Sequence, residues 1–420
     1  MYDEFCFVID SRKVIPGCIF VAIKGEKTDG HLYVKDALSK GAKYAVVEKP
    51  VDAPKECLIR VDSTVDFLIN TAWERIQRYE PFVIGITGSN GKTTTKELIY
   101  QSIGKELCFS NPGNFNTEIG LPLSIINHYR GERYLALEMA MNKFGDIARL
   151  CQIAQPDISV LLNVGTAHRG VAGSDQAILD GKLQIVEMMK PNGTAVVIND
   201  ERILQRISTK SLVTFGYQKG DYQLMNYFYD DLCTIAAYKT INEIVQFQFR
   251  SIWNVGQLTN IAAVLAVLDL IKIKPSKDLI ENFSPIQGRF KVFRHRDVFI
   301  IDDCYNASLE SFKVAVETLR KLGKRSFAVV GSIKEQGIYS DQTHQELGKI
   351  LECTDGVIVY NSEPEIDAMV CSKEILRTND IEKIVSFLRK TIKPQDAILF
   401  KASRAVQMEN VLAKYLEGDQ

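Results

Sequence analysis

The 420-residue chain lacks a strong net charge, a long hydrophobic run and a basic leader. Its formal net charge is −1, so no overall basic field exists to hold nucleic acid, and no acidic tail is present. No apolar run is long enough to span a bilayer, and the first residues lack the basic start of a secretory signal. These absences argue against nucleic-acid binding and membrane insertion, and they favour small substrates.

The nine cysteines are scattered, and no two of them form a C-x-x-C pair. An odd number of cysteines in a long chain without a signal is typical of a reducing compartment, so we expect free thiols and a cytoplasmic protein. Zinc is not expected, because its ligands are not clustered. Hydrophobic residues make up 46% and charged residues 25%, which is ordinary for a globular protein. The length predicts two or three domains, and we expect a monomer.

Three blocks follow one another along the chain. The first, residues 1–80, ends at Glu80-Pro81, because proline disfavours helix in the residue before it. The second and third, residues 81–286 and 287–420, each alternate strands with helices, which predicts parallel sheets with right-handed crossovers. We therefore predict an α/β protein with a small N-terminal α/β domain, a central domain with a mostly parallel sheet, and a doubly wound, Rossmann-like C-terminal domain. Residues 208–252 are aromatic and β-branched, and they predict antiparallel strands.

Short apolar runs predict the buried strands of the two larger blocks. In the central block the predicted strands are Phe82–Thr87, Tyr134–Glu138, Ile158–Asn163 and Thr194–Asn199, and the predicted helices are Asp146–Ala154, Gln176–Met189 and Leu258–Ile271. In the third block the predicted strands are Val298–Asp302, Ser326–Gly331, Gly356–Tyr360 and Ala397–Lys401, and the predicted helices are Ser311–Leu322, Gln342–Leu351 and Ile381–Lys390.

The sharpest local signal is a glycine-rich turn that follows the strand Phe82–Thr87 and opens a helix. Gly85 to Thr95 reads G-I-T-G-S-N-G-K-T-T-T. Glycines let the backbone N–H groups face a phosphate, and the helix N-terminus adds partial positive charge. Lys92 can reach the β- and γ-phosphates, and the Thr93 hydroxyl can ligate Mg²⁺. Five residues separate Gly85 from Gly91 where the common phosphate loop has four, but the position between strand and helix favours nucleotide binding over a surface turn.

The T-G-x-N-G-K-T form of this loop resembles the Mur ligase family. Other segments resemble that family too, above all its member that adds D-alanyl-D-alanine to UDP-N-acetylmuramoyl-tripeptide. These segments are Asp10–Arg12, Gly17–Ala22, Asp29–His31, Asn114–Pro122, Asn163–His168, Gly173-Ser174 followed by Lys182, Ile301–Ala307 and Lys401–Arg404. The resemblance covers nearly the whole chain.

The resemblance implies an ATP-dependent ligase of peptidoglycan precursor synthesis. A carboxylate does not react with an amine at neutral pH, because its leaving group is oxide. Transfer of the γ-phosphoryl group of ATP gives an acyl phosphate, which the amine attacks to give an amide, ADP and phosphate. This chemistry needs positioning and charge neutralisation more than covalent help from the protein. The implied cofactors are ATP and Mg²⁺, and the implied partners are UDP-N-acetylmuramoyl-peptide and D-alanyl-D-alanine.

The resemblance also implies roles for individual residues. Nucleotide contacts are expected from Gly88, Ser89, Asn90, Gly91, Lys92, Thr93, Thr94, Asn260, Arg289, Asp302, Tyr305 and Asn306. The expected metal ligands are Thr93, Glu138, His168 and carbamylated Lys182, and the expected catalytic residues are Lys92, His168, Lys182 and Asp303. Substrate contacts are expected from Ser11, Arg12, Asn114, Asn116, Thr117, Lys401, Ser403 and Arg404.

Plainer alternatives stand beside several of these roles. Glu138 could be a surface residue at a strand end, and Lys182 could be an unmodified lysine that pairs with phosphate or with Asp180. Asp302 could form an ordinary Asx turn, and Arg12 could belong to a local turn.

Parts of the sequence depart from the family's pattern. They are Gly331–Gly337, Ser308–Glu310, Ser251–Asn254, Ala402 and a short stretch before Asp10, which predicts an abbreviated UDP-binding domain. The departures leave two alternatives open. One is a sibling ligase with another amino acid or acceptor, and the other is a nucleotide-binding homologue without turnover.

Overall fold

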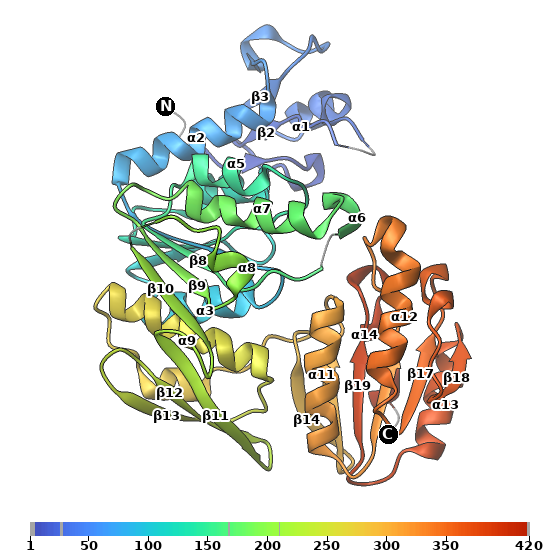
Figure 1. Ribbon diagram of the computed structural model, residues 1–420. Coiled ribbons are helices and arrows are strands. Elements are labelled where there is room, and N and C mark those ends of the chain that lie inside the picture. The colour runs from blue at the N-terminus through green and yellow to red at the C-terminus, as the bar shows by residue number, and fades with distance from the viewer. Residues whose placement is uncertain (1–4, 26–27, 167–168, 210, 418–420) are drawn as a thin grey trace.

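The computed structural model describes residues 5–25, 28–166, 169–209 and 211–417, which form three successive sheets with helices around them. Figure 1 shows the three domains, each built on one of these sheets. The predicted three-domain α/β class is confirmed. In the described part of the chain, no helix has both the length and the apolar character needed to cross a membrane. All nine cysteines are described, and each is a free thiol.

The N-terminal sheet is parallel and has four strands in the order β1-β2-β3-β4. The strands are β1 (Phe7–Val8), β2 (Ile19–Val21), β3 (Tyr44–Val47) and β4 (Leu58–Arg60), with η1 (Ser11–Lys13), η2 (Gly30–Tyr33), α1 (Val34–Ser39) and η3 (Lys55–Cys57) between them. Helix α2 (Thr64–Tyr79) follows and ends at Glu80, whose φ of 44° is left-handed. The predicted helix end before Pro81 is therefore confirmed.

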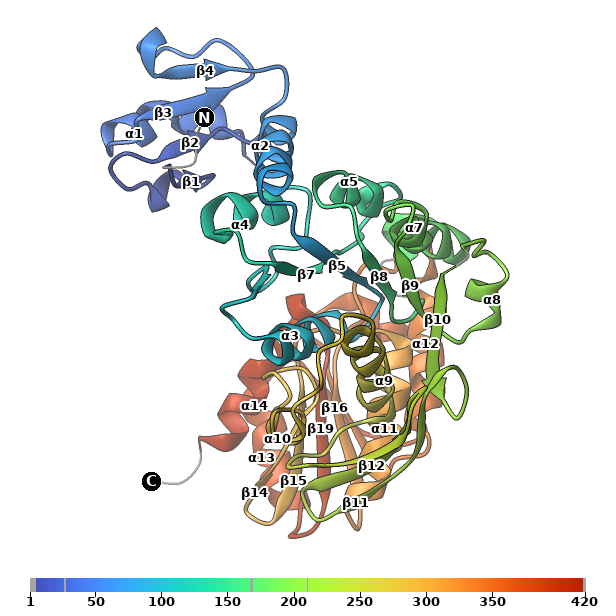
Figure 2. The ribbon, with the colours of Figure 1, turned by 90° about the vertical axis from the view of Figure 1, so that its left-hand side faces the viewer.

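Helix α2 joins the N-terminal domain to the central one. Its apolar face, with Leu68 and Ala72, shares one core with Val21 of β2 and Leu121 of α4 (Gly120–His128). The main chain of Phe7 also exchanges two hydrogen bonds with the Asn127 side chain, at 2.8 and 2.9 Å. Figure 2 shows the N-terminal domain projecting from the central domain beside α2 and α4.

The central sheet has nine strands in the order β13-β12-β11-β10-β9-β8-β5-β7-β6. Its parallel part contains β5 (Phe82–Thr87), β6 (Cys108–Ser110), β7 (Tyr134–Glu138), β8 (Ile158–Leu161) and β9 (Thr194–Ile198), with α3 (Lys92–Ile103), α5 (Asp146–Ile153), α6 (Arg169–Ala172), α7 (Asp175–Glu187) and α8 (Glu201–Leu204) in the connections. Strand β5 pairs with β7 on one side and with β8 on the other. The chain forms β6 and β7 on the first side before it crosses to β8. Such a switch in strand order opens a crevice at the carboxyl ends of the strands.

The predicted antiparallel region is only partly right. Strand β10 (Leu212–Tyr217) pairs in parallel with β9 and with β11 (Tyr222–Asp230). Within this region, the antiparallel pairs are β11 with β12 (Cys233–Lys239) and β12 with β13 (Ile244–Phe249). The difference arises because α8 returns the chain to the start of β9, so that β10 extends the parallel ladder before the hairpins begin.

Helix α9 (Val255–Leu270) packs beside α3 and begins three residues before the predicted start at Leu258. Asn254 is its N-cap, and a reciprocal pair of hydrogen bonds with Gln257 forms a capping box. Ten of its residues are buried, so the helix is apolar all round and serves as a central core element. Short helix α10 (Lys277–Asn282) then leads to the third domain.

The third sheet has the order β14-β15-β19-β16-β17-β18, and all its strands except β14 run parallel. Its elements are β14 (Lys291–His295), β15 (Val298–Asp303), α11 (Leu309–Leu322), β16 (Ser326–Val330), η4 (Gly337–Tyr339), α12 (Ser340–Leu351), β17 (Gly356–Tyr360), η5 (Pro364–Ala368), β18 (Glu374–Thr378), α13 (Ile381–Thr391), β19 (Ala397–Lys401), η6 (Arg404–Val406) and α14 (Met408–Leu416). The four predicted strands and three predicted helices are present with small shifts at their ends, whereas β14, β18 and α14 were not predicted.

Candidate active site

The phosphate-binding loop lies at the switch point of the central sheet. It runs from the end of β5 to the first turn of α3, where Gly91 is the N-cap with φ of 86°. A Cβ atom on Gly91 would lie 2.0 Å from Nδ2 of Asn260 and would displace that carboxamide, and the left-handed backbone at Gly91 favours glycine. The free N–H groups of the first turn of α3 point to the crevice, which suits an anion.

Asn163 holds this loop from the neighbouring strand. Its Oδ1 accepts from the backbone N–H of Asn90 at 2.8 Å, and its Nδ2 donates to the carbonyl of Asn90 at 2.9 Å. The Ser89 N–H also donates to the Asn163 carbonyl at 3.1 Å. Asn163 was recognised in a motif but was given no role, because a side chain that acts 73 residues away leaves no local signal.

The Lys92 side chain curls back over the loop. Its Nζ donates to the carbonyl of Gly88 at 2.8 Å and to that of Ser89 at 3.4 Å. Burial lowers the pKa of Lys92, and the nearby Glu138 carboxylate opposes that shift. The ammonium therefore lies at the place where the loop would hold phosphate oxygens.

Glu138 is a buried carboxylate at the end of β7, only 2% exposed. Its Oε2 accepts from the Thr93 hydroxyl at 2.7 Å, and its Oε1 accepts from Nδ2 of Asn116 at 2.7 Å. The alternative of a surface glutamate is therefore wrong. Both bonds come from neutral donors, and an anion buried among neutral donors is favourable only if a cation is close. A carboxylate and a hydroxyl are the hard oxygen ligands that Mg²⁺ prefers, so this donor set fits the ion.

Lys182 faces the same region from α7 and is 3% exposed. Burial, with a further contribution from the Lys92 charge, lowers the pKa of Lys182 to about 7. The expected alternative partner Asp180 accepts instead from Gln176 and Arg206, at 2.8 and 2.7 Å. The pairing with Asp180 is therefore wrong. The fourth predicted ligand, His168, lies outside the described residues.

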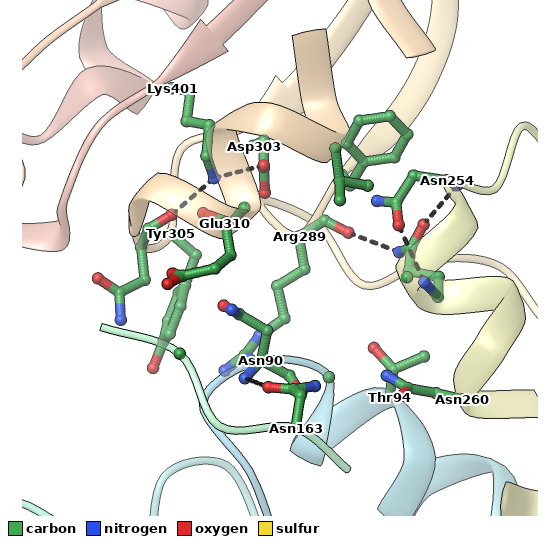
Figure 3. A pocket seen from close by; sticks show the side chains of 18 of the residues that line it. Asn90, Thr94, Asn163, Asn254, Asn260, Arg289, Asp303, Tyr305, Glu310 and Lys401 are labelled. Carbon is green, nitrogen blue, oxygen red and sulfur yellow. Dashed lines mark hydrogen bonds and ion pairs between the residues drawn. The ribbon is translucent and has the colours of Figure 1, made fainter. Parts of the chain in front are cut away.

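The third domain supplies the opposite wall. At the ends of β15 and β19, Lys401 donates to Asp303 at 2.5 Å (Figure 3) and to the carbonyl of Asn306 at 3.0 Å. Burial raises the pKa of Asp303, although the Lys401 charge opposes the shift. The Arg289 guanidinium stacks 4.1 Å from the centre of the Tyr305 ring, which keeps its planar fork at the domain gap.

A cavity of about 290 Å³ lies between these two walls. Figure 3 shows side chains from the phosphate loop, α9 and the third domain directed around it. Among its lining residues are the predicted Asn90, Gly91, Thr94, Asn260, Arg289, Asp303, Tyr305, Asn306 and Lys401. Gly88, Ser89, Lys92, Thr93 and Asp302 do not line it. The size suits a compact organic ligand.

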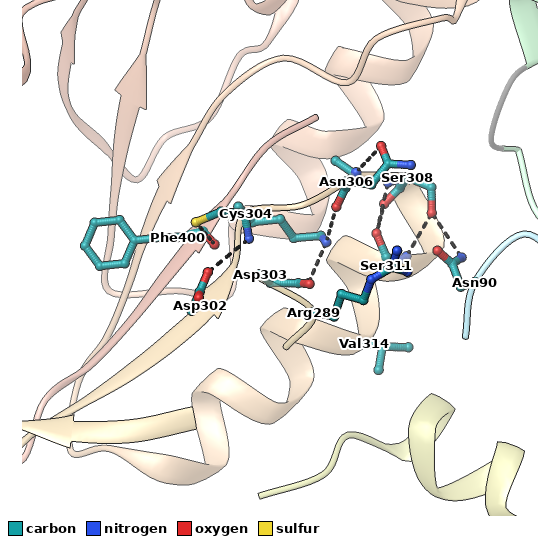
Figure 4. Close-up of polar contacts among 12 residues, drawn as sticks. Asn90, Arg289, Asp302, Asp303, Cys304, Asn306, Ser308, Ser311, Val314 and Phe400 are labelled. Atoms are coloured by element: carbon teal, nitrogen blue, oxygen red, sulfur yellow. Dashed lines mark hydrogen bonds and ion pairs between the residues drawn. The ribbon is translucent and has the colours of Figure 1, made fainter. Parts of the chain in front are cut away.

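Asp302 lies behind this wall. Its Oδ2 accepts from the Gly288 N–H at 3.0 Å, and its Oδ1 accepts from the Cys304 N–H, two residues on, at 3.4 Å (Figure 4). The second bond is the Asx turn that stood as the alternative. Asp302 therefore shapes the turn that carries Asp303 and Tyr305.

Several sets of contacts tie the third domain to the central one, including Lys321 with Tyr227 and Arg294 with Asp231, and two of them lie beside the cavity. Glu310, on α11, accepts from the N–H and the hydroxyl of Thr166 at 2.9 and 3.3 Å, and Nδ2 of Asn90 donates to Ser308 at 3.3 Å. At the other end of the interface, the Gly170 N–H donates to the Glu335 carbonyl at 2.8 Å. The cavity is therefore bridged on two sides. Glu310 was noted only as a departure from the family pattern.

The predicted substrate residues are spread over all three domains. Ser11 and Arg12 lie in η1, where the exposed Arg12 guanidinium pairs with Asp10 at 2.8 Å, in agreement with the local-turn alternative. Asn116 holds Glu138, and the Thr117 hydroxyl accepts from the Gly120 N–H at 3.2 Å. Besides Lys401, three predicted residues remain: exposed Asn114 lies before α4, Ser403 is the N-cap of η6 and accepts from the Lys334 N–H at 2.9 Å, and Arg404 begins η6 and pairs with Glu409 at 2.5 Å.

Fold and site together define a multidomain α/β protein whose phosphate loop faces a second domain across a cavity. Residues 6–72, 86–268 and 288–404 match the Mur ligase family catalytic domain, the Mur ligase middle domain and the Mur ligase glutamate ligase domain. The chain belongs to the Mur ligase family.

Individual relatives match over almost their whole length. The UDP-N-acetylmuramoyl-tripeptide–D-alanyl-D-alanine ligase of Synechocystis is 31% identical, over 97% of this chain and 91% of that protein. The Bacillus subtilis protein of the same name is 30% identical, over 97% and 92%. The crystal structure of the MurF ligase from Thermotoga maritima in complex with ADP superimposes with a TM-score of 0.95 and 40% identity, over 99% of this chain and 98% of that one.

Proposed function

We propose that the chain is an ATP-dependent ligase that joins D-alanyl-D-alanine to UDP-N-acetylmuramoyl-tripeptide in peptidoglycan precursor synthesis. The observation that carries this proposal is the meeting of the phosphate loop, buried Glu138 and buried Lys182 at one crevice, in a chain whose full-length relatives bear that activity in their names. The T. maritima relative is in complex with ADP, which supports nucleotide binding by this chain, and we place the nucleotide in the cavity between α9 and the third domain. A cytoplasmic location belongs to the same proposal and is supported by nine free thiols.

Phosphoryl transfer would use the residues at the phosphate loop. The N–H groups of the loop and of the first turn of α3 would hold the phosphates, and Lys92 would exchange its bonds to the Gly88 and Ser89 carbonyls for bonds to phosphate oxygens. Arg289, at the domain gap, would bind phosphate oxygens with its planar fork. The γ-phosphoryl group passes to the tripeptide carboxylate. The amine of the incoming dipeptide then attacks the acyl phosphate and displaces phosphate.

Glu138 and Thr93 would hold Mg²⁺, because their oxygens already meet at 2.7 Å in a buried place. The ion, when bound, would neutralise the negative charge that develops during phosphoryl transfer. Asn116 would keep the second oxygen of Glu138 in place.

Lys182 would act as a carbamate. The amine must be neutral to add to carbon dioxide, after which it loses a proton and becomes an anionic oxygen ligand. A pKa of about 7, caused by burial and by Lys92, leaves a large share of Lys182 neutral at physiological pH. Carbamylation would also replace a buried positive charge beside Lys92 with a negative one.

The main rival is a sibling ligase with a different amine, and one observation favours it. Lys334, in the altered Gly331–Gly337 segment, pairs with Glu363 and Glu365 at 2.6 and 2.7 Å, and its N–H donates to Ser403. A charged cluster therefore stands beside the last loop of the third domain, where substrate contacts were expected.

The direct test is phosphate release measured with ATP, Mg²⁺ and UDP-N-acetylmuramoyl-tripeptide against a panel of amino acids and dipeptides. D-alanyl-D-alanine should give the highest kcat/KM. A higher value with another amine would select the sibling ligase. Absence of phosphate release with every amine, while ATP still binds, would select the non-catalytic homologue.

Two variants test the assigned chemistry in the same assay. Lys92→Ala should abolish turnover, because the transferred phosphoryl group loses its cation, and near wild-type activity would refute the phosphate-loop assignment. Lys182→Ala should also lose activity, and a short carboxylic acid should restore part of it by supplying the missing carboxylate. Failure of rescue would refute the carbamate role.

A further inference from the structure

One fully buried lysine has no place in the chemistry described so far. Lys96 lies on α3, one turn after Thr93, and its side chain is completely buried. Its Nζ donates to the main-chain carbonyl of Asn111 at 2.6 Å and lies 2.9 Å from Oε1 of Glu97. Removing an ammonium group from water is costly unless it is paired and hydrogen-bonded. Lys96 does not line the cavity between the two domains, and its ammonium contacts Asn111 rather than the phosphate loop.

The residue that Lys96 contacts is itself fully buried and fully engaged. Asn111 follows β6, whose pairing with β7 ends at Ser110 and Ala136. Beyond that point the Asn111 side chain continues the ladder: its Oδ1 accepts from the N–H of Glu138 at 2.8 Å, and its Nδ2 donates to the carbonyl of Glu138 at 3.0 Å. A second donor bond runs from Nδ2 to the Phe115 carbonyl at 2.8 Å. The main chain of Glu138 is therefore held on both sides by one carboxamide.

Lys96 and Thr93 thus reach the same glutamate by two routes from one helix. Thr93 bonds to the carboxylate directly, at 2.7 Å, and Lys96 reaches the main chain through Asn111. A glutamate whose main chain and carboxylate oxygens are both held keeps one side-chain rotamer. Such contacts orient a metal-binding side chain before the ion arrives. We propose that Lys96 is a positioning residue, which acts through Asn111 to hold Glu138 in its ion-binding orientation. This inference rests on the proposed function, in which Glu138 binds the metal.

The test separates metal binding from nucleotide binding. Mn²⁺ replaces Mg²⁺ as the probe, and its affinity for the ADP-bound full chain is measured by electron paramagnetic resonance. ADP affinity is measured by calorimetry in EDTA. Lys96→Met keeps most of the side-chain volume, and it should weaken Mn²⁺ binding at least tenfold while metal-free ADP binding changes less than twofold. Asn111→Ala should do the same. The Lys96→Met/Asn111→Ala double variant should lose no more Mn²⁺ affinity than either single variant, because both residues act through one chain of contacts.

Two controls lie on the same helix. Glu97→Gln removes the ion pair of Lys96 and leaves the Asn111 contact, so Mn²⁺ affinity should stay within twofold of wild type. Ile103→Ala removes buried apolar surface at the end of α3, and it calibrates a loss of stability that does not involve Asn111.

Several outcomes would overturn the inference. Equal losses of Mn²⁺ and metal-free ADP affinity in Lys96→Met would show that Lys96 supports the phosphate loop as a whole. A similar Mn²⁺ loss in Ile103→Ala would show that any destabilisation of α3 suffices, and additive losses in the double variant would refute the route through Asn111. If the wild-type chain bound no Mn²⁺ with ADP, the proposed function would fail as well, which distinguishes that failure from an error about Lys96 alone.

Discussion

Single buried charges account for most of what the site can do. Glu138, Lys182 and Lys96 are each at most 3% exposed, and their surroundings differ. Two neutral donors hold the Glu138 carboxylate, and Lys182 is buried beside another cation. Lys96 donates to a backbone carbonyl and pairs with a neighbouring carboxylate. A buried charge is costly unless its surroundings favour it. The site therefore combines a pre-formed anionic position with a lysine that is easily neutralised.

The burial of Lys182 predicts a pH-dependent stability. Its folded pKa of about 7 lies below the value of 10.5 expected when the chain is unfolded. A depressed lysine pKa means that the native state binds fewer protons than the unfolded state between about pH 7 and 10.5. The destabilisation is therefore full below pH 7 and fades as pH rises through that window. Lys182→Met should be more stable than wild type, by about 2 kcal/mol more at pH 6.5 than at pH 9.

Urea unfolding in carbon dioxide-free buffer with EDTA measures this difference, because carbamylation and metal binding are then prevented. A pH-independent gain in the Lys182→Met variant would contradict the prediction.

Residue types in the site were predictable where a local pattern carried them, and not where distant segments meet. The loop 88–94 and the strand-end position of Glu138 follow from spacing and alternation along the chain. By contrast, Asn111 and Asn163 act on residues 27 and 73 positions away. Lys96 was given no role from the sequence, because a lysine in a helix is ordinarily exposed. Nothing in the local sequence shows that it is buried.

Elements were predicted best where apolar runs are buried on both faces. Strands β5, β7 and β19 match the predicted bounds because parallel strands covered by helices read as continuous apolar runs. Strand β14 was missed because its turn to β15 is Arg296-Asp297, with φ of 50° and 58°. That left-handed pair normally signals itself by Asn-Gly or Asp-Gly.

At the junction between β5 and α3, we expect that adding one methyl group to Gly91 weakens ATP binding. Gly91→Ala should lower ATP affinity at least tenfold, because the new Cβ would displace the Asn260 carboxamide, which lines the cavity, or shift the loop itself. Its left-handed backbone adds a loss of stability of about 1 kcal/mol. Calorimetric titration with ATP and urea unfolding measure the two effects separately.

Gly104→Ala is the matched control, since Gly104 caps the other end of α3 with φ of 96° and an added Cβ would meet nothing within 4 Å. It should lose stability and keep ATP affinity. Equal ATP affinity in the two variants would contradict the steric argument.

At the scale of the whole molecule, the cavity exists only because two domains meet. One wall comes from the phosphate loop and α9, and the other from the ends of β15 and β19. Ligands on separate domains predict that the site is completed by closure, which also excludes water from the acyl phosphate. The sequence indicated the two walls but not their contacts, because neither Glu310 nor Thr166 belongs to a pattern that identifies its partner.

Glu310 is the residue through which this closure can be tested. Its carboxylate accepts two bonds from Thr166 across the domain gap, and hydrogen bonds to a charged acceptor typically contribute about 1.5–3 kcal/mol. Glu310→Ala should therefore shift the chain toward an open arrangement, with a larger radius of gyration in small-angle scattering and a several-fold higher KM for ATP. Glu346→Ala, which removes the same charge from α12 and a contact only to Gln342, should leave both values unchanged. If Glu310→Ala changed neither scattering nor KM, the domains would be held together by the other contacts of the interface, among them Gly170–Glu335 and Arg294–Asp231, and Thr166 would have no part in closure.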